Sequence, residues 1–459
     1  MTHKVSQHES RIAGRTFTYS AEAARLPIRD MESGRIRGHI FYVAYRVPTG
    51  NEKPRPVLFA WGGGPSGPSL GMQMAYGPKT VTDDGRLVDN ELSLLSVADL
   101  VFVDPVGTGF SRPRKPEYLD EFYSTNGDAR ATSEFIRVWI AMNDAELAPL
   151  FLNGQSYGVW RAAFTAELLE QSGRHVTGLV LTSGGTGMAD EFTQRAYEIA
   201  LRVPDYAATA FHHGRLPAEF GDSAEEAWRL AEAWARETYG PALSRIDALT
   251  NAERESIAHD LSRRTGYPLD RIDRDTLAFT PPRYLRDFTG DEDTRLDLFD
   301  MRRIAGADVN GGNPVRDRAQ ALYLREHLGY RTDLAYIGLE TGYTPVTSPD
   351  YQPAGARWNY DSGTNSGEPP PDGGPPGKEP WVRRAIESNP DLQVFVEAAV
   401  YDSLNFCAAN EDRKRRMPPD VADNFELHCY FAGHGSFRDP DGYPLLVQDI
   451  RNFIIRAAE

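Results

Sequence analysis

The segment that decides the fold reads FLNGQSYGVWRAAFTAELLE, residues 151–170. Its apolar start ends in Gly-Gln-Ser-Tyr-Gly at 154–158, and apolar residues at helical spacing follow at once. This order predicts a strand that turns sharply into a helix, with Ser156 in the turn. Because glycines flank the serine, the turn can be tight, and the hydroxyl would project from the carboxyl end of the strand.

Similar apolar runs recur along the chain, and helical patterns lie between them. Continuous hydrophobicity bounded by Gly, Pro or Asn is typical of strands buried on both faces of a parallel sheet. The alternation predicts an α/β fold, with a mostly parallel central sheet and helices on both faces. The expected strands are HIFYVAYRV (39–47), RPVLFAW (55–61), ADLVFVDPV (98–106), PLFLNG (149–154), VTGLVLTSGG (176–185), LQVFVEAAVYD (392–402) and FELHCYFAGHG (425–435).

The pattern predicts a core that is interrupted by an insertion. Residues 1–189 form the first part of the core, and residues 331–459 form the second part. Residues 190–330 read as mainly helical and charged, as expected for a cap on the sheet, and a separate helical domain is the alternative. Residues 361–380 are rich in Pro and Gly and predict a loop, either a solvated linker or a cover over a site.

Composition limits the classes of partner. The chain has 50 basic and 66 acidic residues, so its formal charge is −16, which argues against nucleic acid as a ligand. No apolar stretch is suited to a signal peptide or a membrane span, so we expect no membrane contact and a cytoplasmic protein. Cys407 and Cys429 are expected to be buried free thiols, with one disulfide as the alternative. The oligomeric state stays open, a homodimer being one alternative.

Two later strand ends supply partners for the serine, whose hydroxyl is a poor nucleophile without a base. Asp402 ends one apolar run, and His434 stands in Gly-His-Gly at the exit of the next. His434 would accept the proton of Ser156, and Asp402 would orient the imidazole and stabilise its charged form. Each residue alone could be an ordinary turn or cap residue, but the order Ser, Asp, His at three strand ends favours a catalytic set.

Backbone amides for a developing oxyanion come from the glycines that follow Trp61. Gly62, Gly63 and Gly64 allow the chain to approach a substrate oxygen closely. A phosphate-binding loop is the alternative, but neither Lys-Ser/Thr nor G-x-G-x-x-G spacing is present. The adjacent histidines at 212–213 lack metal-binding spacing, so we expect no metal and no cofactor.

Three longer blocks share a further pattern: WGGGPSGPSLGMQMAYGP (61–78), SLLSVADLVFVDPVGTGFSR (93–112) and FLNGQSYGVWRAAFTAELL (151–169). They resemble the serine carboxypeptidase family of α/β-hydrolases, especially its cytosolic-type bacterial branch. VYDSLNF (400–406) and FAGHGSF (431–437) resemble the segments that carry the family's acid and base. The resemblance extends from about Gly38 onward.

The resemblance implies an α/β-hydrolase fold with a helical cap, and hydrolysis of peptides from a free C-terminus through an acyl-enzyme. Asp104, in the second block, would shape a turn near the site. The roles implied by position are Ser156 as nucleophile, His434 as base, Asp402 as orienting acid, and the amides of Gly64 and Tyr157 as oxyanion donors.

Departures from the family concern binding of the substrate's terminal carboxylate. Gly62 replaces an Asn, Ser66 replaces a Gly, and Gln155 replaces a Glu of a proton-sharing pair that favours acidic conditions. Gln155 can donate an amide hydrogen bond at any pH, whereas a carboxyl must be protonated to donate. Gly62, Gly63 and Gln155 are therefore the candidate substrate-binding residues.

Three hypotheses follow for a peptide or small acyl substrate. The first is a carboxypeptidase that works near neutral pH. The second is an esterase, amidase or acyltransferase that has lost recognition of the C-terminus. The third is a non-catalytic binding protein on a hydrolase scaffold, against which the complete Ser, Asp and His set argues.

Overall fold

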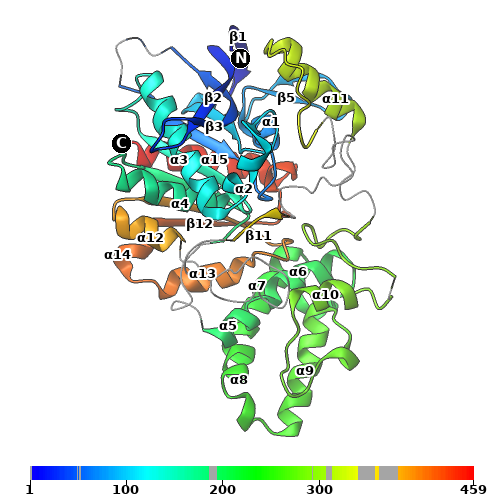
Figure 1. The fold of residues 1–459 in the computed structure, drawn as a ribbon. Coiled ribbons are helices and arrows are strands. Elements are labelled where there is room, and N and C mark those ends of the chain that lie inside the picture. The colour runs from blue at the N-terminus through cyan, green and yellow to red at the C-terminus, as the bar shows by residue number, and fades with distance from the viewer. Residues whose placement is uncertain are drawn as a thin grey trace. The chain divides into compact units, whose positions relative to one another are not determined.

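The computed structural model describes residues 3–48, 50, 53–185, 194–291, 293–306, 313–339, 357–360 and 381–459 (Figure 1). The expected loop at 361–380 lies outside these residues. The chain divides into two compact units, each built from segments that are distant in sequence. The first unit comprises Met1–Thr182, Gly312–Phe395 and Pro444–Glu459, and the second comprises Ser183–Gly311 and Val396–Tyr443.

A central sheet organises the first unit. Its strand order there is β1-β2-β3-β7-β4-β9-β10, in which β7, β4, β9 and β10 run parallel and the first three strands add antiparallel. β11 begins in this unit and continues into the second, where β12 pairs with it. The strands are β1 (Lys4–Ile12), β2 (Arg15–Arg29), β3 (Ile36–Arg46), β4 (Val57–Trp61), β7 (Asp99–Asp104), β9 (Leu150–Gln155), β10 (Gly178–Thr182), β11 (Gln393–Ala399) and β12 (Phe425–Tyr430). The short strands are β5 (Lys79–Val81), β6 (Leu87–Asp89) and β8 (Arg112–Pro113).

The parallel strands are the apolar runs of the sequence. Every residue of β4, β7 and β10 is buried, as expected for strands covered on both faces. The predicted α/β fold with a mostly parallel sheet is confirmed. The sequence reading missed β1 and β2, because exposed polar residues alternate with buried ones there and leave no continuous apolar run.

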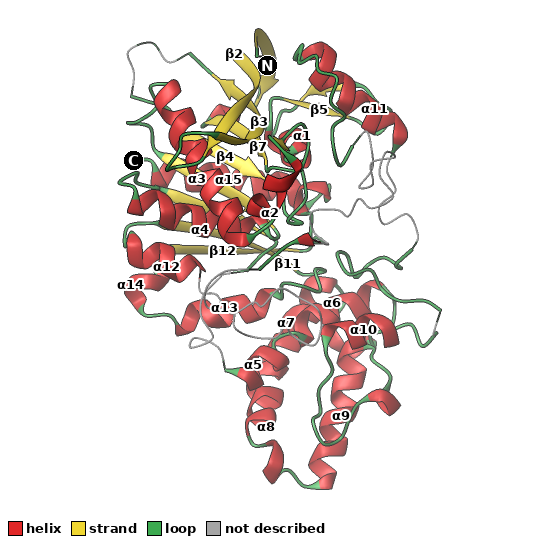
Figure 2. Cartoon of the chain, in the orientation of Figure 1, coloured by secondary structure: helices red, strands yellow, loops and turns green. Residues whose placement is uncertain are grey.

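Helices flank the sheet of the first unit (Figure 2). α3 and α12 both pack on α4, and Phe164 of α4 lies 4.8 Å from Trp381 of α12 between ring centroids. Phe453 of α15 contacts Phe151 and Phe395, with centroids 6.1 and 5.6 Å away. The helices are α1 (Leu70–Tyr76), α2 (Leu119–Phe122), α3 (Thr125–Met142), α4 (Gly158–Gln171), α11 (Pro314–Leu322), α12 (Trp381–Ser388) and α15 (Gly442–Ala457), whose first turn belongs to the second unit.

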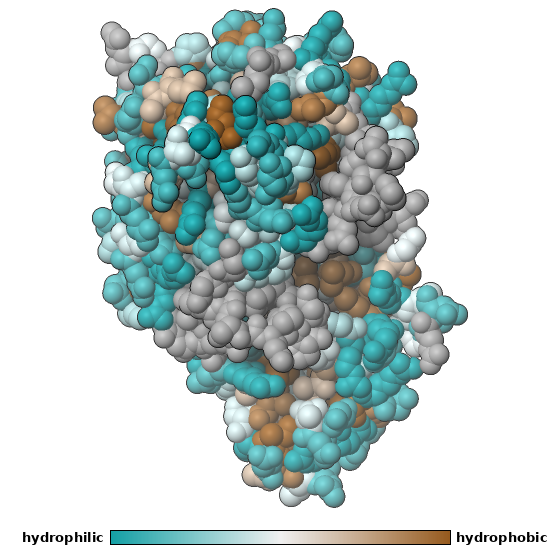
Figure 3. All heavy atoms as spheres, viewed as in Figure 1, coloured by the Kyte–Doolittle hydropathy of each residue, from teal (hydrophilic) through white to brown (hydrophobic). Residues whose placement is uncertain are grey.

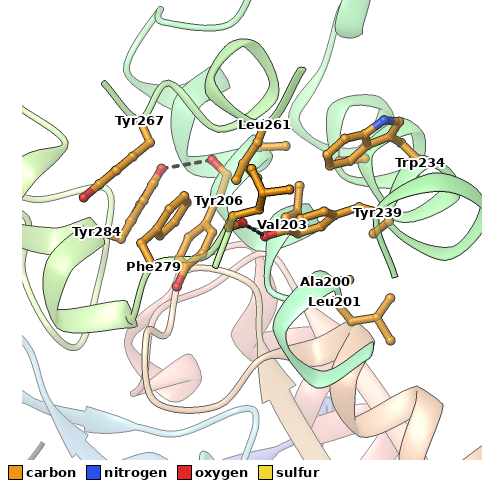
Figure 4. Close-up of a cluster of buried hydrophobic side chains, with 14 of the residues drawn as sticks. Ala200, Leu201, Val203, Tyr206, Trp234, Tyr239, Leu261, Tyr267, Phe279 and Tyr284 are labelled. Carbon is orange, nitrogen blue, oxygen red and sulfur yellow. Dashed lines mark hydrogen bonds between the residues drawn. The ribbon is translucent and has the colours of Figure 1, made fainter. Parts of the chain in front are cut away.

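The second unit is mainly helical among its described residues, and the predicted insertion at 190–330 stays a prediction. Aromatic side chains form much of its core (Figure 4). Tyr206 stacks on Tyr284 with ring centroids 3.9 Å apart, and Tyr267 stacks on Phe279 at 4.1 Å. Its helices are α5 (Arg195–Ala200), α6 (Val203–His212), α7 (Ala224–Trp234), α8 (Gly240–Ser244), α9 (Asn251–Thr265), α10 (Pro281–Asp287), α13 (Cys407–Arg416) and α14 (Pro419–Ala422). A role as a cap over substrate stays a prediction.

The two cysteines correct one expectation. We expected free thiols, but Cys407 and Cys429 form a disulfide in the second unit. The first residue of α13 lies beside β12, and the two Cα atoms are 5.9 Å apart, a usual separation for a disulfide. Sequence could not show this proximity, because it depends on how α13 packs on the strand.

The visible surface is mostly hydrophilic. On the face shown in Figure 3, hydrophilic residues make up most of the coloured surface, with hydrophobic residues scattered among them. Among the residues that the structure describes, none of the helices combines the length and hydrophobicity needed to span a bilayer.

Packing of α15 on the sheet provides a test of the fold. Phe453 is buried and contacts two strand phenylalanines, so Phe453→Ala should lower the free energy of unfolding by about 3–5 kcal/mol. Leu445→Ala on the same helix is the control, because Leu445 is 61% exposed and should change stability little. Urea unfolding followed by circular dichroism measures both, and equal effects would contradict the packing described.

Candidate active site

Ser156 lies in the turn between β9 and α4. Its φ is +55°, a left-handed conformation that is uncommon for a residue with a side chain. Two hydrogen bonds hold the turn: the Ser156 N–H donates to the carbonyl of Thr182 at 2.9 Å, and the Val159 N–H donates to the carbonyl of Ser156 at 3.0 Å. The predicted strand-turn-helix around the serine is therefore present, with backbone strain at Ser156 itself.

The flanking glycines are required by close backbone contacts. A Cβ added at Gly154 would lie 2.0 Å from the carbonyl oxygen of Gly158. A Cβ added at Gly158 would lie 2.9 Å from the carbonyl oxygen of Gly62 and 2.9 Å from the ring of Trp61. No side chain fits at either position without movement of the backbone, so the G-x-S-x-G pattern has a steric cause here.

The glycine loop after β4 lies directly against Ser156. A Cβ added at Gly63 would be 2.6 Å from the Cβ of Ser156 and 3.0 Å from the amide nitrogen of Tyr157. Gly64 has a φ of +116°, which favours glycine, and the Gly67 N–H donates to the carbonyl of Gly63 at 2.8 Å. The structure thus brings the predicted oxyanion segment and the predicted nucleophile together within the first unit.

Arg161 holds this loop in place, and sequence reasoning missed it. Its guanidinium donates to the carbonyls of Gly62 at 3.0 Å and Pro65 at 3.1 Å, and to the carboxylate of Asp128 at 2.6 Å. Both charged side chains are buried. Burial raises the pKa of Asp128, and the charge of Arg161 opposes that rise. Arg161 is the one arginine of α4, in a run of mostly apolar residues near the start of the helix.

Gln155 and Asp104 occupy the positions that the motifs suggested. Gln155 is the last residue of β9 and is half-buried next to Ser156. Asp104 ends β7 and is fully buried. It accepts hydrogen bonds from the N–H and hydroxyl of Ser69 at 2.8 and 2.7 Å and from the hydroxyl of Tyr336 at 3.1 Å. Burial raises the pKa of Asp104 to about 6, and its contacts fit the expected structural role.

Aromatic rings surround Tyr157 in the first unit. Trp160 and Trp358 contact it edge-on, with centroids 5.5 and 5.3 Å away, and Tyr360 lies at 6.4 Å. Trp358 also stacks on Tyr123 at 6.3 Å. These rings pack on Tyr157 beside the turn that carries Ser156.

Asp402 and His434 form a hydrogen-bonded pair in the second unit. His434 Nδ1 lies 2.7 Å from Asp402 Oδ2, and Asp402 also accepts from the N–H of Leu404 at 3.0 Å. The His434 N–H donates to the carbonyl of Phe299 at 2.7 Å. Asp402 is fully buried and His434 is 9% exposed. This geometry orients the imidazole with its Nε2 atom opposite the carboxylate.

Opposing influences set the pKa of His434. Burial alone would lower it, because burial disfavours the charged imidazolium. The charge and hydrogen bond of Asp402, together with the charge of Glu397, outweigh burial and raise the pKa of His434 above its ordinary value of 6.5. A histidine so placed can accept a proton near neutral pH and hold it beside a carboxylate.

One cluster of metal-type ligands occurs among the described residues. The ligand atoms of Cys407, Glu411 and Cys429 lie within 4.8 Å of one another. The two sulfur atoms are bonded to each other, so neither is a thiolate that could bind a metal.

Comparisons with known proteins agree with the motifs. The serine carboxypeptidase family model matches residues 32–230. A probable serine carboxypeptidase CPVL from Dictyostelium discoideum is 26% identical over 274 residues, 57% of this chain and 45% of that protein. The pheromone-processing carboxypeptidase kex1 of Talaromyces marneffei is 33% identical over 140 residues, 28% of this chain and 22% of that protein.

Residues 32–230 of the chain are similar to the serine carboxypeptidase family. A similar solved structure is that of Kex1(delta)p, a prohormone-processing carboxypeptidase from Saccharomyces cerevisiae. The match covers 95% of this chain and 91% of the Kex1(delta)p chain, with a TM-score of 0.54 and 15% identity. That likeness shows the shared α/β-hydrolase fold. The chain spans less than half the length of the two curated relatives.

The buried pair beneath the glycine loop can be tested by a double-mutant cycle. Arg161→Gln leaves the buried Asp128 without its partner and should lower the free energy of unfolding by about 3–5 kcal/mol. Adding Asp128→Asn should recover part of that loss, because the uncompensated charge is removed. Urea unfolding measures both.

The control for this cycle is Arg137→Gln on α3, whose exposed ion pair with Glu134 should contribute less than about 1 kcal/mol. The cycle compares the double variant with Arg161→Gln and Asp128→Asn alone. If the free energy of unfolding lost in the double variant equals the sum of the losses in the two single variants, the coupling is contradicted.

Proposed function

We propose that the protein is a serine hydrolase that acts through an acyl-enzyme, and that its reaction is removal of C-terminal residues from peptides near neutral pH. The observation that carries the proposal is the strained turn at Ser156, packed directly against Gly63 of the glycine loop. Both relatives reported above are named as carboxypeptidases. The proposed catalytic residues are Ser156, Asp402 and His434.

Hydrogen bonds within each unit hold the proposed nucleophile and the loop of the proposed base. In the first unit the N–H of Ser156 donates to the carbonyl of Thr182. Ser183 follows Thr182 in the chain, and in the second unit its hydroxyl donates to the carbonyl of His434.

The proposed reaction proceeds in two halves. His434 accepts the hydroxyl proton of Ser156 while the serine oxygen attacks the scissile carbonyl carbon. The tetrahedral intermediate then expels the amine, which takes this proton from His434. An ester of Ser156 remains. Water then loses a proton to His434 and attacks the ester, and Ser156 leaves with that proton while the shortened peptide is released as an acid. Asp402 stabilises the imidazolium in both halves.

Backbone amides would stabilise the oxyanion in each half. The proposed donors are the N–H groups of Gly64 and Tyr157, and the N-terminus of the 14-residue helix α4 adds its dipole. Close packing of Gly63 on the amide nitrogen of Tyr157 supports this assignment.

Recognition of the terminal carboxylate is proposed for Gln155 and the backbone of Gly62 and Gly63. An amide at position 155 donates without a titratable proton, so binding should not weaken as pH rises. The base must be neutral to act, and the raised pKa of His434 places the fall in rate on the acid side of the profile. The location is proposed to be cytoplasmic, as the sequence suggests.

An esterase, amidase or acyltransferase that acts on a small acyl substrate is the second candidate. Gly62 and Gln155 favour it, because both replace family side chains that contact the terminal carboxylate. Ser156, Asp402 and His434 would keep their roles.

Paired substrates separate the two candidates. We expect turnover of N-blocked dipeptides with a free C-terminus and little turnover of their C-terminal amides or of aryl esters, measured at pH 5 and pH 7.5. Ser156→Ala should reduce the rate to background, since it lacks the nucleophile. Ester cleavage without a preference for the free acid would favour the second candidate, and full activity of Ser156→Ala would exclude both.

Reintroducing the family's acid tests the role of Gln155. Gln155→Glu should raise KM for free-acid dipeptides at pH 7.5, because an ionised carboxylate repels the substrate's terminus, while KM at pH 5 changes less. Steady-state kinetics at both pH values measure this. A KM that is independent of pH in the variant would show that Gln155 does not face the carboxylate.

A further inference from the structure

Glu397 is a carboxyl group inside the apolar strand β11. It is fully buried, in a stretch that reads VFVEAAV, where its neighbours in sequence are apolar. Burial raises the pKa of Glu397 to about 7, and the charge of Asp402 adds to that rise. Carboxyl groups with strongly shifted pKa values cluster at functional sites.

The carboxyl of Glu397 contacts two serines, Ser183 and Ser436, at the loop that carries His434. One oxygen accepts from the hydroxyl of Ser436, two residues after His434. The other accepts from the N–H of Ser183 at 2.7 Å and lies 3.3 Å from the hydroxyl oxygen of Ser183. The Ser183 hydroxyl in turn donates to the carbonyl of His434. Every group in this network belongs to the second unit.

The hydrogen bonds around Glu397 can form whether its carboxyl is ionised or protonated. The single hydroxyl proton of Ser183 is used on the His434 carbonyl, which can only accept, so a bond between that hydroxyl and Glu397 requires a proton on the carboxyl. Ser436 lies 3.4 Å from the carbonyl of Gly433 and can turn its proton there when Glu397 is protonated. Ionised Glu397 instead accepts the proton of Ser436.

Charged groups of both signs act on the imidazole of His434. Asp402 and Glu397 favour its protonated form, and Arg438 opposes it. Asp300 lies beside Gly433, but Arg302 pairs with that carboxylate at 2.8 Å. The charge of Glu397 therefore acts on the imidazole in the same direction as the charge of Asp402.

We infer that Glu397 is a positioning residue for the general base: its carboxyl fixes the loop 433–436 through Ser183 and Ser436, and its charge helps His434 to hold a proton. This inference rests on the proposed function for its kinetic consequences. Its structural part concerns only contacts of the second unit.

Two substitutions at Glu397 separate its charge from its hydrogen bonds. Glu397→Gln keeps an oxygen for the Ser183 N–H and an amide that can donate to Ser436, so it should keep most of the maximal kcat. Because it removes a negative charge, its acid limb should move to lower pH than in the wild type. Glu397→Leu breaks the network and should lower kcat by about tenfold or more, with KM little changed.

The control is Glu426→Gln, on the neighbouring strand β12, where the carboxyl pairs with His428 at 2.8 Å. It should leave the profile of kcat/KM against pH unchanged. A profile of Glu397→Gln that superimposes on that of the wild type, or a kcat of Glu397→Leu equal to that of the wild type, would overturn the inference.

An NMR titration of the imidazole decides the matter without turnover. The His434 signal is identified by its absence in His434→Gln, and its pKa should be lower in Glu397→Gln than in the wild type and in Glu426→Gln. Equal values would refute the inference. If the wild type shows no turnover that depends on Ser156, the proposed function fails, while the titration still decides the role of Glu397.

Discussion

The left-handed backbone of Ser156 is the constraint from which the site in the first unit is built. A residue with a side chain adopts φ = +55° only when its surroundings hold it there. Here β10 supplies a carbonyl for the Ser156 N–H, and the backbone at Gly63 and Gly154 passes too close for any side chain. Sheet order therefore fixes the turn, since β4 and β10 are the two neighbours of β9.

Buried charges hold the polar groups of each unit in place. In the first unit, Arg161 ties the glycine loop to α4 through two carbonyls and is itself neutralised by Asp128. In the second unit, Asp402 and Glu397 provide negative charge next to His434. Buried ionic groups add little net stability, but they fix geometry when every partner is present. The positions of the reacting groups thus depend on polar contacts inside an apolar core.

Much of the fold and of the candidate site could be predicted from sequence, because their signals are local. Apolar runs marked the parallel strands, and the glycines around Ser156 marked its turn. Asp402 and His434 followed from their places at strand ends, and the structure pairs them. The contacts that the sequence did not predict depend on packing between distant segments. They are the Arg161–Asp128 pair, the network of Glu397 and the Cys407–Cys429 disulfide. The polar strands β1 and β2 gave no apolar run.

The central claim is that Ser156 and the Asp402–His434 pair act as one catalytic set. The most direct measurement is the rate and site of modification by a fluorophosphonate, which forms a stable adduct with an activated serine, located by peptide mass spectrometry. We predict one adduct, on Ser156, that forms much more slowly in folded His434→Ala. No adduct, an adduct on another serine, or an unchanged rate in His434→Ala would contradict the account.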